Sequence, residues 1–246
     1  MPARGLLSLT IAVAVTALAS EVPPPETLAR LEAGATALET WPGAFTLTTR
    51  AVISKPDGDD REESVTVMRM AGGPDGPEVK EIVSATRDGK DVTAEARGEL
   101  EKERKQAGKT DEKEKEEEDD DGFGMTLPGG KQTGKFAFSA LPLADGACGA
   151  AFAPRAEHAK EPGLTTGELR WECTTLDPLW LTARPVKNPK GVKEMTLRME
   201  LVRTGEMIYV ARTVTDGVGG VLFIKRKFHV ETEIAELAPP PAGGGS

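Results

Sequence analysis

The sequence predicts an α+β fold, in which a helix packs on an antiparallel β-sheet. Several segments alternate apolar and polar side chains, the pattern of strands that bury one face. Short connections rich in Gly, Asp and Pro separate these segments, as in an antiparallel meander. An amphipathic helix precedes the strands, and a sheet with one apolar face needs such a cover.

The predicted helix covers residues 26–40. Its apolar side chains recur at spacings of three and four and therefore share one face: Leu28, Leu31, Ala35 and Leu38. Prolines precede the helix, and Pro42-Gly43 ends it. The apolar stripe is narrow, so we expect this helix to pack on the sheet.

Alternation places strands at residues 45–53, 64–70 and 79–85 in the first half of the chain. Residues 93–105 favour a helix. Residues 106–122 are dominated by Lys, Glu and Asp, so they are expected to form a solvated, disordered insertion. A calcium site is the alternative, but the acids lack the spaced ligands and central Gly of an EF-hand loop.

The second half has a clearer strand pattern. Strands are predicted at residues 169–175, 195–201, 208–214 and 222–234. Cys173 is expected to point inward from the first of these, and residues 216–220 are expected to form a turn. Arg226 interrupts the apolar face of the last strand, which indicates a bulge or a paired inward charge.

The chain begins with the features of a secretory signal peptide. Arg4 supplies a positive charge, residues 6–18 are almost all apolar or small, and Ala17-Leu18-Ala19 fits the small-x-small cleavage rule. The apolar run is shorter than the roughly 20 residues of a spanning helix. We therefore expect cleavage after Ala19, giving residues 1–19 as signal peptide, rather than a retained anchor. Glu21 stands where a lipoprotein would carry its cysteine.

A single exported domain is predicted over residues 20–237, with a disordered Pro- and Gly-rich tail at 238–246 and no membrane span after cleavage. The formal charge of -9 argues against nucleic acid and anionic membranes as partners. In an oxidising compartment Cys148 and Cys173 most simply form a structural disulfide. A redox site normally uses Cys-x-x-Cys, which is absent.

The sequence predicts no enzyme, no catalytic residue, no metal site and no cofactor. It lacks Gly-x-Ser-x-Gly, His-Glu-x-x-His and Walker patterns. Its histidines are His158, in a polar loop segment, and His229, which shares a strand face with Glu231 and Glu233. Those three side chains have types that bind metal, but the same alternation is expected of any solvent-facing side of a strand.

Inward methionines are the most suggestive candidates for ligand binding. Met68 and Met70 share one strand face, and Met195 and Met199 share another. Methionine adapts its shape to apolar ligands, although it is also an ordinary core residue. An apolar cavity would be lined by the following candidates: Met68, Met70, Trp171, Met195, Leu197 and Met199.

Two segments resemble LolA-like exported proteins, relatives of the periplasmic lipoprotein carrier. They are residues 84–93 and the C-terminal run through Thr213-Val214-Thr215-Asp216-Gly217, residues 219–228 and Thr232-Glu233-Ile234. The resemblance implies a curved antiparallel sheet, an incomplete barrel covered on its concave face by helices. It also implies a cavity for acyl chains of lipids or lipoproteins, and in some members a regulatory protein partner.

Two functions follow as expectations. The first is a periplasmic carrier or sensor that binds lipid acyl chains or lipoprotein-like apolar ligands in a half-barrel cavity. The second is a non-enzymatic interaction module of the envelope, with a filled core and a protein partner bound at a strand edge or at the charged insertion. A continuous cavity lined by the methionines favours the first, and side chains packed at native density favour the second.

Overall fold

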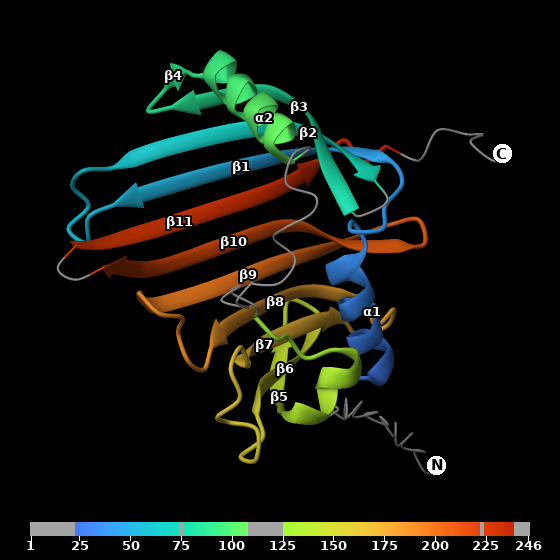
Figure 1. The fold of residues 1–246 in the computed structure, drawn as a ribbon. Helices are drawn as coiled ribbons and strands as arrows, with labels where there is room; N and C mark the ends of the chain where they lie inside the picture. The colour runs from blue at the N-terminus through green and yellow to red at the C-terminus, as the bar shows by residue number, and fades with distance from the viewer. Residues whose placement is uncertain (1–22, 74–75, 108–124, 222–223, 239–246) are drawn as a thin grey trace, which may run out of the picture.

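The computed structural model describes residues 23–73, 76–107, 125–221 and 224–238 (Figure 1). The predicted signal peptide, residues 108–122 of the predicted insertion and residues 239–246 of the predicted tail lie outside these ranges. The described helices are α1 (Pro25–Thr36), α2 (Thr93–Ala107) and the short 3-10 helix η1 (Gly130–Lys135). Among the described residues, no helix has the length and apolar character needed to cross a membrane.

The strands form one eleven-stranded antiparallel sheet in the order β4-β3-β2-β1-β11-β10-β9-β8-β7-β6-β5 (Figure 1). Their bounds are β1 (Ala44–Ser54), β2 (Glu62–Gly73), β3 (Gly76–Arg87), β4 (Lys90–Asp91), β5 (Phe136–Ala144), β6 (Ala147–Pro154), β7 (Thr165–Glu172), β8 (Pro178–Pro185), β9 (Val192–Thr204), β10 (Met207–Val221) and β11 (Ile224–Ala235). Within β1–β4 and within β5–β11, sequence neighbours are sheet neighbours, and these two runs of strands join where β1 pairs with β11. The sheet is open, with β4 and β5 at its two ends, and the predicted antiparallel meander is confirmed.

The sequence predicted the wrong last residue for one helix and one strand, and hydrogen bonds explain both differences. α1 stops at Thr36 rather than at residue 40, where a turn takes over with a bond from the Glu39 N–H to the Thr36 carbonyl (3.0 Å). β7 stops at Glu172. The Glu172 carboxylate accepts the Thr174 N–H (2.8 Å), so the chain turns there and Cys173 lies in the turn rather than in the strand.

The predicted turn at residues 216–220 is also wrong, because this segment belongs to β10. Its glycines serve packing rather than reversal of the chain. A Cβ atom on Gly217 would lie 2.2 Å from Cζ of Phe228, so the Phe228 ring packs directly over the Gly217 backbone. Gly217 and Phe228 are cross-strand partners, and a glycine facing an aromatic ring is a recurrent feature of sheets.

The strands β5, β6 and β8 have no counterpart in the sequence prediction. Their sequences are rich in Ala, Pro and Gly, which have low intrinsic strand propensity. Each nevertheless contributes a side chain with 0–2% exposure to the core, namely Phe136, Phe152 and Leu181. Tertiary packing, rather than local preference, therefore determines these strands.

α1 lies on one face of the sheet, which we call the inner face. A Cβ atom on Gly34 would lie 3.0 Å from Leu201 Cδ2 and 3.1 Å from Ile208 Cγ2, so the helix approaches β9 and β10 closely. Directly opposed residues of an antiparallel pair point to the same face, and residues alternate along each strand. The strand register therefore extends the inner face from Leu201 across the whole sheet.

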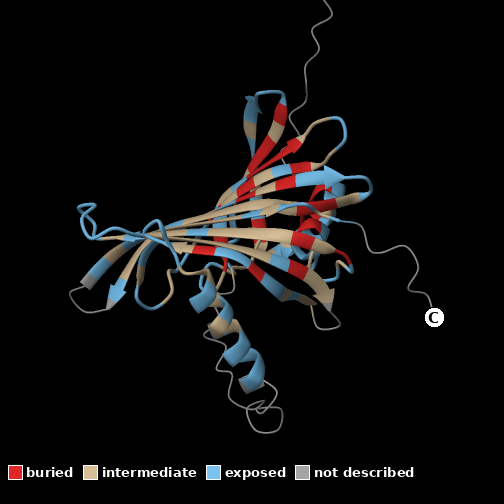
Figure 2. Cartoon of the chain, turned by 90° about the horizontal axis from the view of Figure 1, so that it is seen from above, coloured by how far each residue is buried: buried red, intermediate tan, exposed pale blue. Residues whose placement is uncertain are grey.

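The inner face is filled where α1 covers it. α1 packs on β8 and β10, and its Leu28 and Leu31 join a core with side chains of β5 to β10, including Phe136 and Leu169 at 0% exposure. Figure 2 shows the buried residues gathered mainly in one part of the sheet, while the long strands elsewhere are mostly of intermediate burial. α2 packs instead on β3, at the other end of the sheet.

A carboxylate between two arginines fixes α1 to the sheet. Asp177, just before β8, accepts hydrogen bonds from Arg203 of β9 (Nε at 2.6 Å) and from Arg30 of α1. The Arg203 hydrogen bond, followed by that of Arg30, lowers the pKa of Asp177 from 3.8 to about 2. Thr27 of α1 adds a hydrogen bond to the Leu176 carbonyl (2.9 Å). The helix is thus held by polar contacts at its edge as well as by apolar packing.

Candidate functional site

Between the two helix-covered ends, the inner face of five neighbouring strands carries apolar and hydroxyl side chains. We call this surface the central inner face. Its residues, from β2 through β1, β11 and β10 to β9, are Thr66, Met68, Leu47, Thr49, Ala51, Ile53, Phe228, Val230, Thr232, Thr213, Thr215, Met195 and Leu197. None of these residues is charged, and the pairing places them side by side in rows; Glu62 of β2, opposite Ile53, adds a charged residue at the edge of this surface.

The central inner face is partly open to solvent. Ile53 is 42% exposed, and the other residues of the surface are half-buried. By contrast, Leu169 and Leu181 on the same face under α1 are 0% exposed. Among the described residues, no helix packs extensively on β1, β2 or β11. An apolar surface of this extent, left half-covered, is typical of a binding surface.

The inward charge at one end of this surface is paired. Arg226 lies on β11 in line with Phe228, and its guanidinium binds Asp60 Oδ2 at 2.7 Å from the loop after β1. The hydrogen bond from Arg226 lowers the pKa of the Asp60 carboxyl. Of the two alternatives raised by the sequence, the paired inward charge is thus the one found at Arg226.

The six residues predicted to line a cavity all lie on the inner face, but the structure divides them. Met68, Met195 and Leu197 are half-buried on the central inner face. Met199 (8% exposed) and Trp171 (2% exposed) belong to the core packed under α1. Met70 of β2, which pairs with Phe45 of β1, is also buried (8% exposed). Packing thus leaves only the first three accessible to a ligand.

The sequence analysis did not select several residues of the central inner face, above all Leu47, Ala51, Ile53 and Val230. Their alternation was readable, but their proximity to the methionines depends on the pairing of β1 with β11. That pairing joins segments almost two hundred residues apart, and no local pattern specifies it. Predicting this pairing would have required evidence that the segments of β1 and β11 contact each other.

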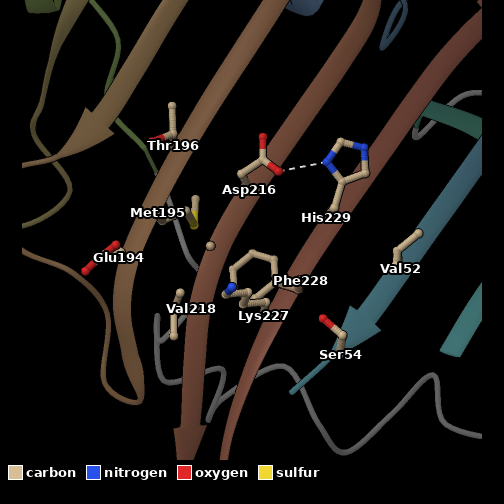
Figure 3. A pocket seen from close by; sticks show the side chains of 11 residues that line it. Val52, Ser54, Glu194, Met195, Thr196, Asp216, Val218, Lys227, Phe228 and His229 are labelled. Carbon is tan, nitrogen blue, oxygen red and sulfur yellow. Dashed lines mark hydrogen bonds and ion pairs between the residues drawn. The ribbon is translucent and has the colours of Figure 1, made fainter. Parts of the chain in front are cut away.

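A depression of about 380 Å³ lies around the β10–β11 pair, mostly on the other face of the sheet (Figure 3). Its main polar feature is a contact between His229 Nδ1 and Asp216 Oδ1 at 2.7 Å. Ser54 and Thr196 also line it, but in the described part of the chain no hydrogen bond joins either hydroxyl to this pair.

The other predicted alternative on this strand was metal binding by His229, Glu231 and Glu233. Glu231 is held by Arg212, whose Nε lies 2.6 Å from Glu231 Oε1, and this hydrogen bond raises the pKa of Arg212. No group of three potential metal ligands occurs in the ranges that the structure describes. His158 contacts Glu161 Oε1 at 2.6 Å in the loop between β6 and β7.

The two cysteines lie at disulfide distance. Cys148 of β6 and Cys173 in the turn after β7 have Cα atoms 5.2 Å apart, at a sequence separation of 25. Cys148 is opposite Trp171, so the pair closes the β6–β7 hairpin beside the core under α1. This position suits the structural role predicted from the sequence.

Comparison with known proteins identifies no family for this chain. No family model matches this chain. No curated protein matches it either. Among solved structures, the chain is similar to the crystal structure of MucB in complex with MucA(peri), with a TM-score of 0.20 and 10% sequence identity over 83% of this chain and 92% of that chain. Neither family membership nor a shared fold follows from these values, and the LolA-like resemblance stays a prediction from the sequence.

Proposed function

We propose that this protein is an exported, non-enzymatic binding protein that holds a lipid acyl chain, or a similar apolar ligand, on the central inner face. The observation that supports the proposal is the continuous, largely uncharged and half-exposed surface across β2, β1, β11, β10 and β9. Sequestering each methylene of a ligand there would contribute about 0.8 kcal/mol. A surface of this kind can therefore bind a long chain without any specific polar contact.

The residues of this surface suit a flexible ligand. Met68 and Met195 lie near opposite edges of the surface, on β2 and β9, and their unbranched side chains can adjust to different chain shapes. Phe228 supplies a large flat contact on the middle strand of this surface, opposite Ile53 of β1. Threonines between these apolar groups offer hydroxyls to a polar head group or to water.

A second function, a protein-interaction module of the envelope, is supported by the filled part of the inner face. Phe136, Leu169 and Leu181 are 0% exposed, so the end of the sheet under α1 is a packed core with no room for a ligand. If the central inner face were covered by a partner protein rather than by lipid, the fold would need no cavity at all. The apolar surface would then be a docking surface.

Native mass spectrometry of protein purified gently from its own envelope separates these two functions. The acyl-binding proposal expects an adduct of lipid-like mass, which disappears after extraction with organic solvent. A bare polypeptide mass before and after extraction, together with no saturable uptake of a fatty acyl probe, would reject it. The same spectra test export, because cleavage after Ala19 gives a chain that begins at Ser20.

A further inference from the structure

The two edges of the sheet differ in whether their outward-facing backbone groups are hydrogen-bonded. The β3 edge is covered by β4 and by side chains from α2: Arg97 Nε donates to the Ile82 carbonyl (2.8 Å), and Arg104 donates to the Lys80 carbonyl (3.2 Å). The Ala85 N–H donates to Thr93 Oγ1 (2.9 Å). Backbone groups that would attract another strand are thus already occupied along this edge.

The β5 edge has no such cover in the described part of the chain, where β5 pairs only with β6. The Arg155 N–H donates to the Lys135 carbonyl (2.8 Å), which makes Phe136 and Pro154 a non-hydrogen-bonded pair. The backbone groups of the even-numbered residues of β5 therefore point away from β6, toward the open edge. β5 carries no charged residue, the usual protection of an exposed edge.

Both ends of this edge are nevertheless closed. At one end, Arg155 Nε donates to the outward carbonyl of Phe136 (3.1 Å). At the other end, Pro142 has no N–H, and its carbonyl accepts a hydrogen bond from Arg170 Nη1 (2.5 Å). Between these two closures, Phe138 and Ala140 each present an outward N–H and an outward carbonyl. The open stretch is therefore just long enough for one pair of residues of an incoming strand.

We propose that this stretch pairs with the same stretch of a second copy of the chain, antiparallel and about a twofold axis through Ser139. In this register Phe138 of each copy lies opposite Ala140 of the other. The two N–H groups and two carbonyls of each copy then all find partners, which is the self-complementarity that a twofold interface requires. Ser139 faces Ser139, and Leu141 faces Ala137.

Side chains and charge favour a second copy as the occupant. On the outer face, Ala137 continues into a row of small residues, Ala153 and Thr166, which line a depression of about 620 Å³. Leu141 of the second copy would lie opposite Ala137, at the β5 end of this row. Although each chain has a formal charge of -9, the paired residues of β5 carry no charge; the arginines at its two ends, Arg155 on the Phe136 carbonyl and Arg170 on the Pro142 carbonyl, lie outside the paired stretch.

The assembly would stop at two copies. Pairing through β5 uses the open edge of each sheet, and the remaining β3 edges are capped by α2. A closed dimer rather than a filament follows from one open edge per chain. Because only a short stretch of strand pairs, we expect a weak dimer that dissociates on dilution.

Sedimentation velocity over a wide range of concentrations tests this proposal, with substitutions at the twofold axis. Wild-type protein should shift from monomer to dimer as its concentration rises. Ser139→Lys and Ser139→Glu should each be monomeric, because each places two like charges opposite one another. An equimolar mixture of the two variants should restore the dimer, because Lys then faces Glu. Restoration by mixing also shows that both variants are folded.

A second variant removes one backbone donor without changing the charge. Ala140→Pro deletes the outward N–H of Ala140 and leaves the bonds between β5 and β6 intact, since proline is tolerated at such edge positions. It should weaken dimerisation about tenfold or more. Val83→Lys, on the other edge strand, is the matched control and should leave the dimer unchanged. A wild-type chain that is monomeric at every concentration, or a dimer indifferent to the Ser139 and Ala140 substitutions, overturns the proposal.

Discussion

The part of the sheet under α1 and the central part follow the same alternation of apolar and polar residues, but they differ in what covers the inner face. Leu181 of β8 is 0% exposed beneath α1, whereas Ile53 of β1, on the same face, is 42% exposed. Alternation gives the side correctly for the apolar residues of β1 and β9. It is wrong for Val214 of β10, expected to share a face with Ile208 and Val210, because a register shift after Val210 turns Val214 to the outer face. The difference shows that alternation specifies a direction and that only packing specifies whether a surface is core or binding site.

The largest expected effect is on the core under α1. Leu181→Ala removes a fully buried side chain and should lower the free energy of unfolding by about 3 to 4 kcal/mol. Ile53→Ala removes a side chain of similar size from the open part and should cost about 1 kcal/mol, because much of it is already in water. Urea denaturation of the two variants measures the difference. Equal losses would show that the two parts are equally packed.

Removal of the disulfide should also act on the part under α1. Replacing Cys148 and Cys173 together with Ala opens a loop of 25 residues and should cost about 3 kcal/mol. The measurement is the urea midpoint with and without a reductant. Wild-type protein should lose stability on reduction and the double variant should not respond. A wild-type midpoint that is insensitive to reductant would show that the cysteines are not bridged.

The polar attachment of α1 should contribute less and depend on pH. Asp177→Asn should cost about 1 to 2 kcal/mol at neutral pH, less than the full pKa change implies, because Arg30 and Arg203 are partly exposed and solvent screens the contact. The pKa of Asp177 is lowered in the folded chain, from 3.8 to about 2. Its contribution is therefore complete above about pH 4 and is lost as the pH falls to about 2.

Unfolding of wild type and Asp177→Asn at several pH values checks this window. The stability difference between the two should be constant above about pH 4 and should shrink towards zero near pH 2. Arg50→Ala, which removes an exposed ion pair with Glu63 far from α1, is the control and should change stability by less than about 0.5 kcal/mol. A difference that persists unchanged at pH 2 would mean that the Asp177 charge is not what holds the helix.

Much of this fold follows from local sequence patterns. The long strands β1, β2, β3 and β9 and both helices were predicted within a few residues, because their apolar residues recur with a clear period. β5, β6 and β8 could not be predicted, since segments such as ACGAAFAP have weak strand preference and depend on neighbouring strands. The sequence showed the glycines at 216–220 but not the Phe228 ring that one of them accommodates.

The candidate site was predictable only in part, for a related reason. The inward methionines were identified correctly as sharing a face, and Met68 and Met195 do lie on the central inner face. That Trp171 and Met199 belong to a filled core depends on where α1 packs, and the narrow stripe of α1 does not specify its position. Burial is decided by contacts between distant segments, which alternation within one strand does not encode.

Titration of solvent-extracted protein with a fluorescent fatty acid tests the central claim most directly, using one valine from each face. Val230 lies on the central inner face, and Val214 on the neighbouring strand points to the outer face; both are half-buried. We predict saturable binding by wild type, binding weakened about tenfold or more by Val230→Lys, and nearly unchanged binding by Val214→Lys. No saturable binding by wild type, or equal losses in the two variants, would contradict the assignment of the central inner face as the binding surface.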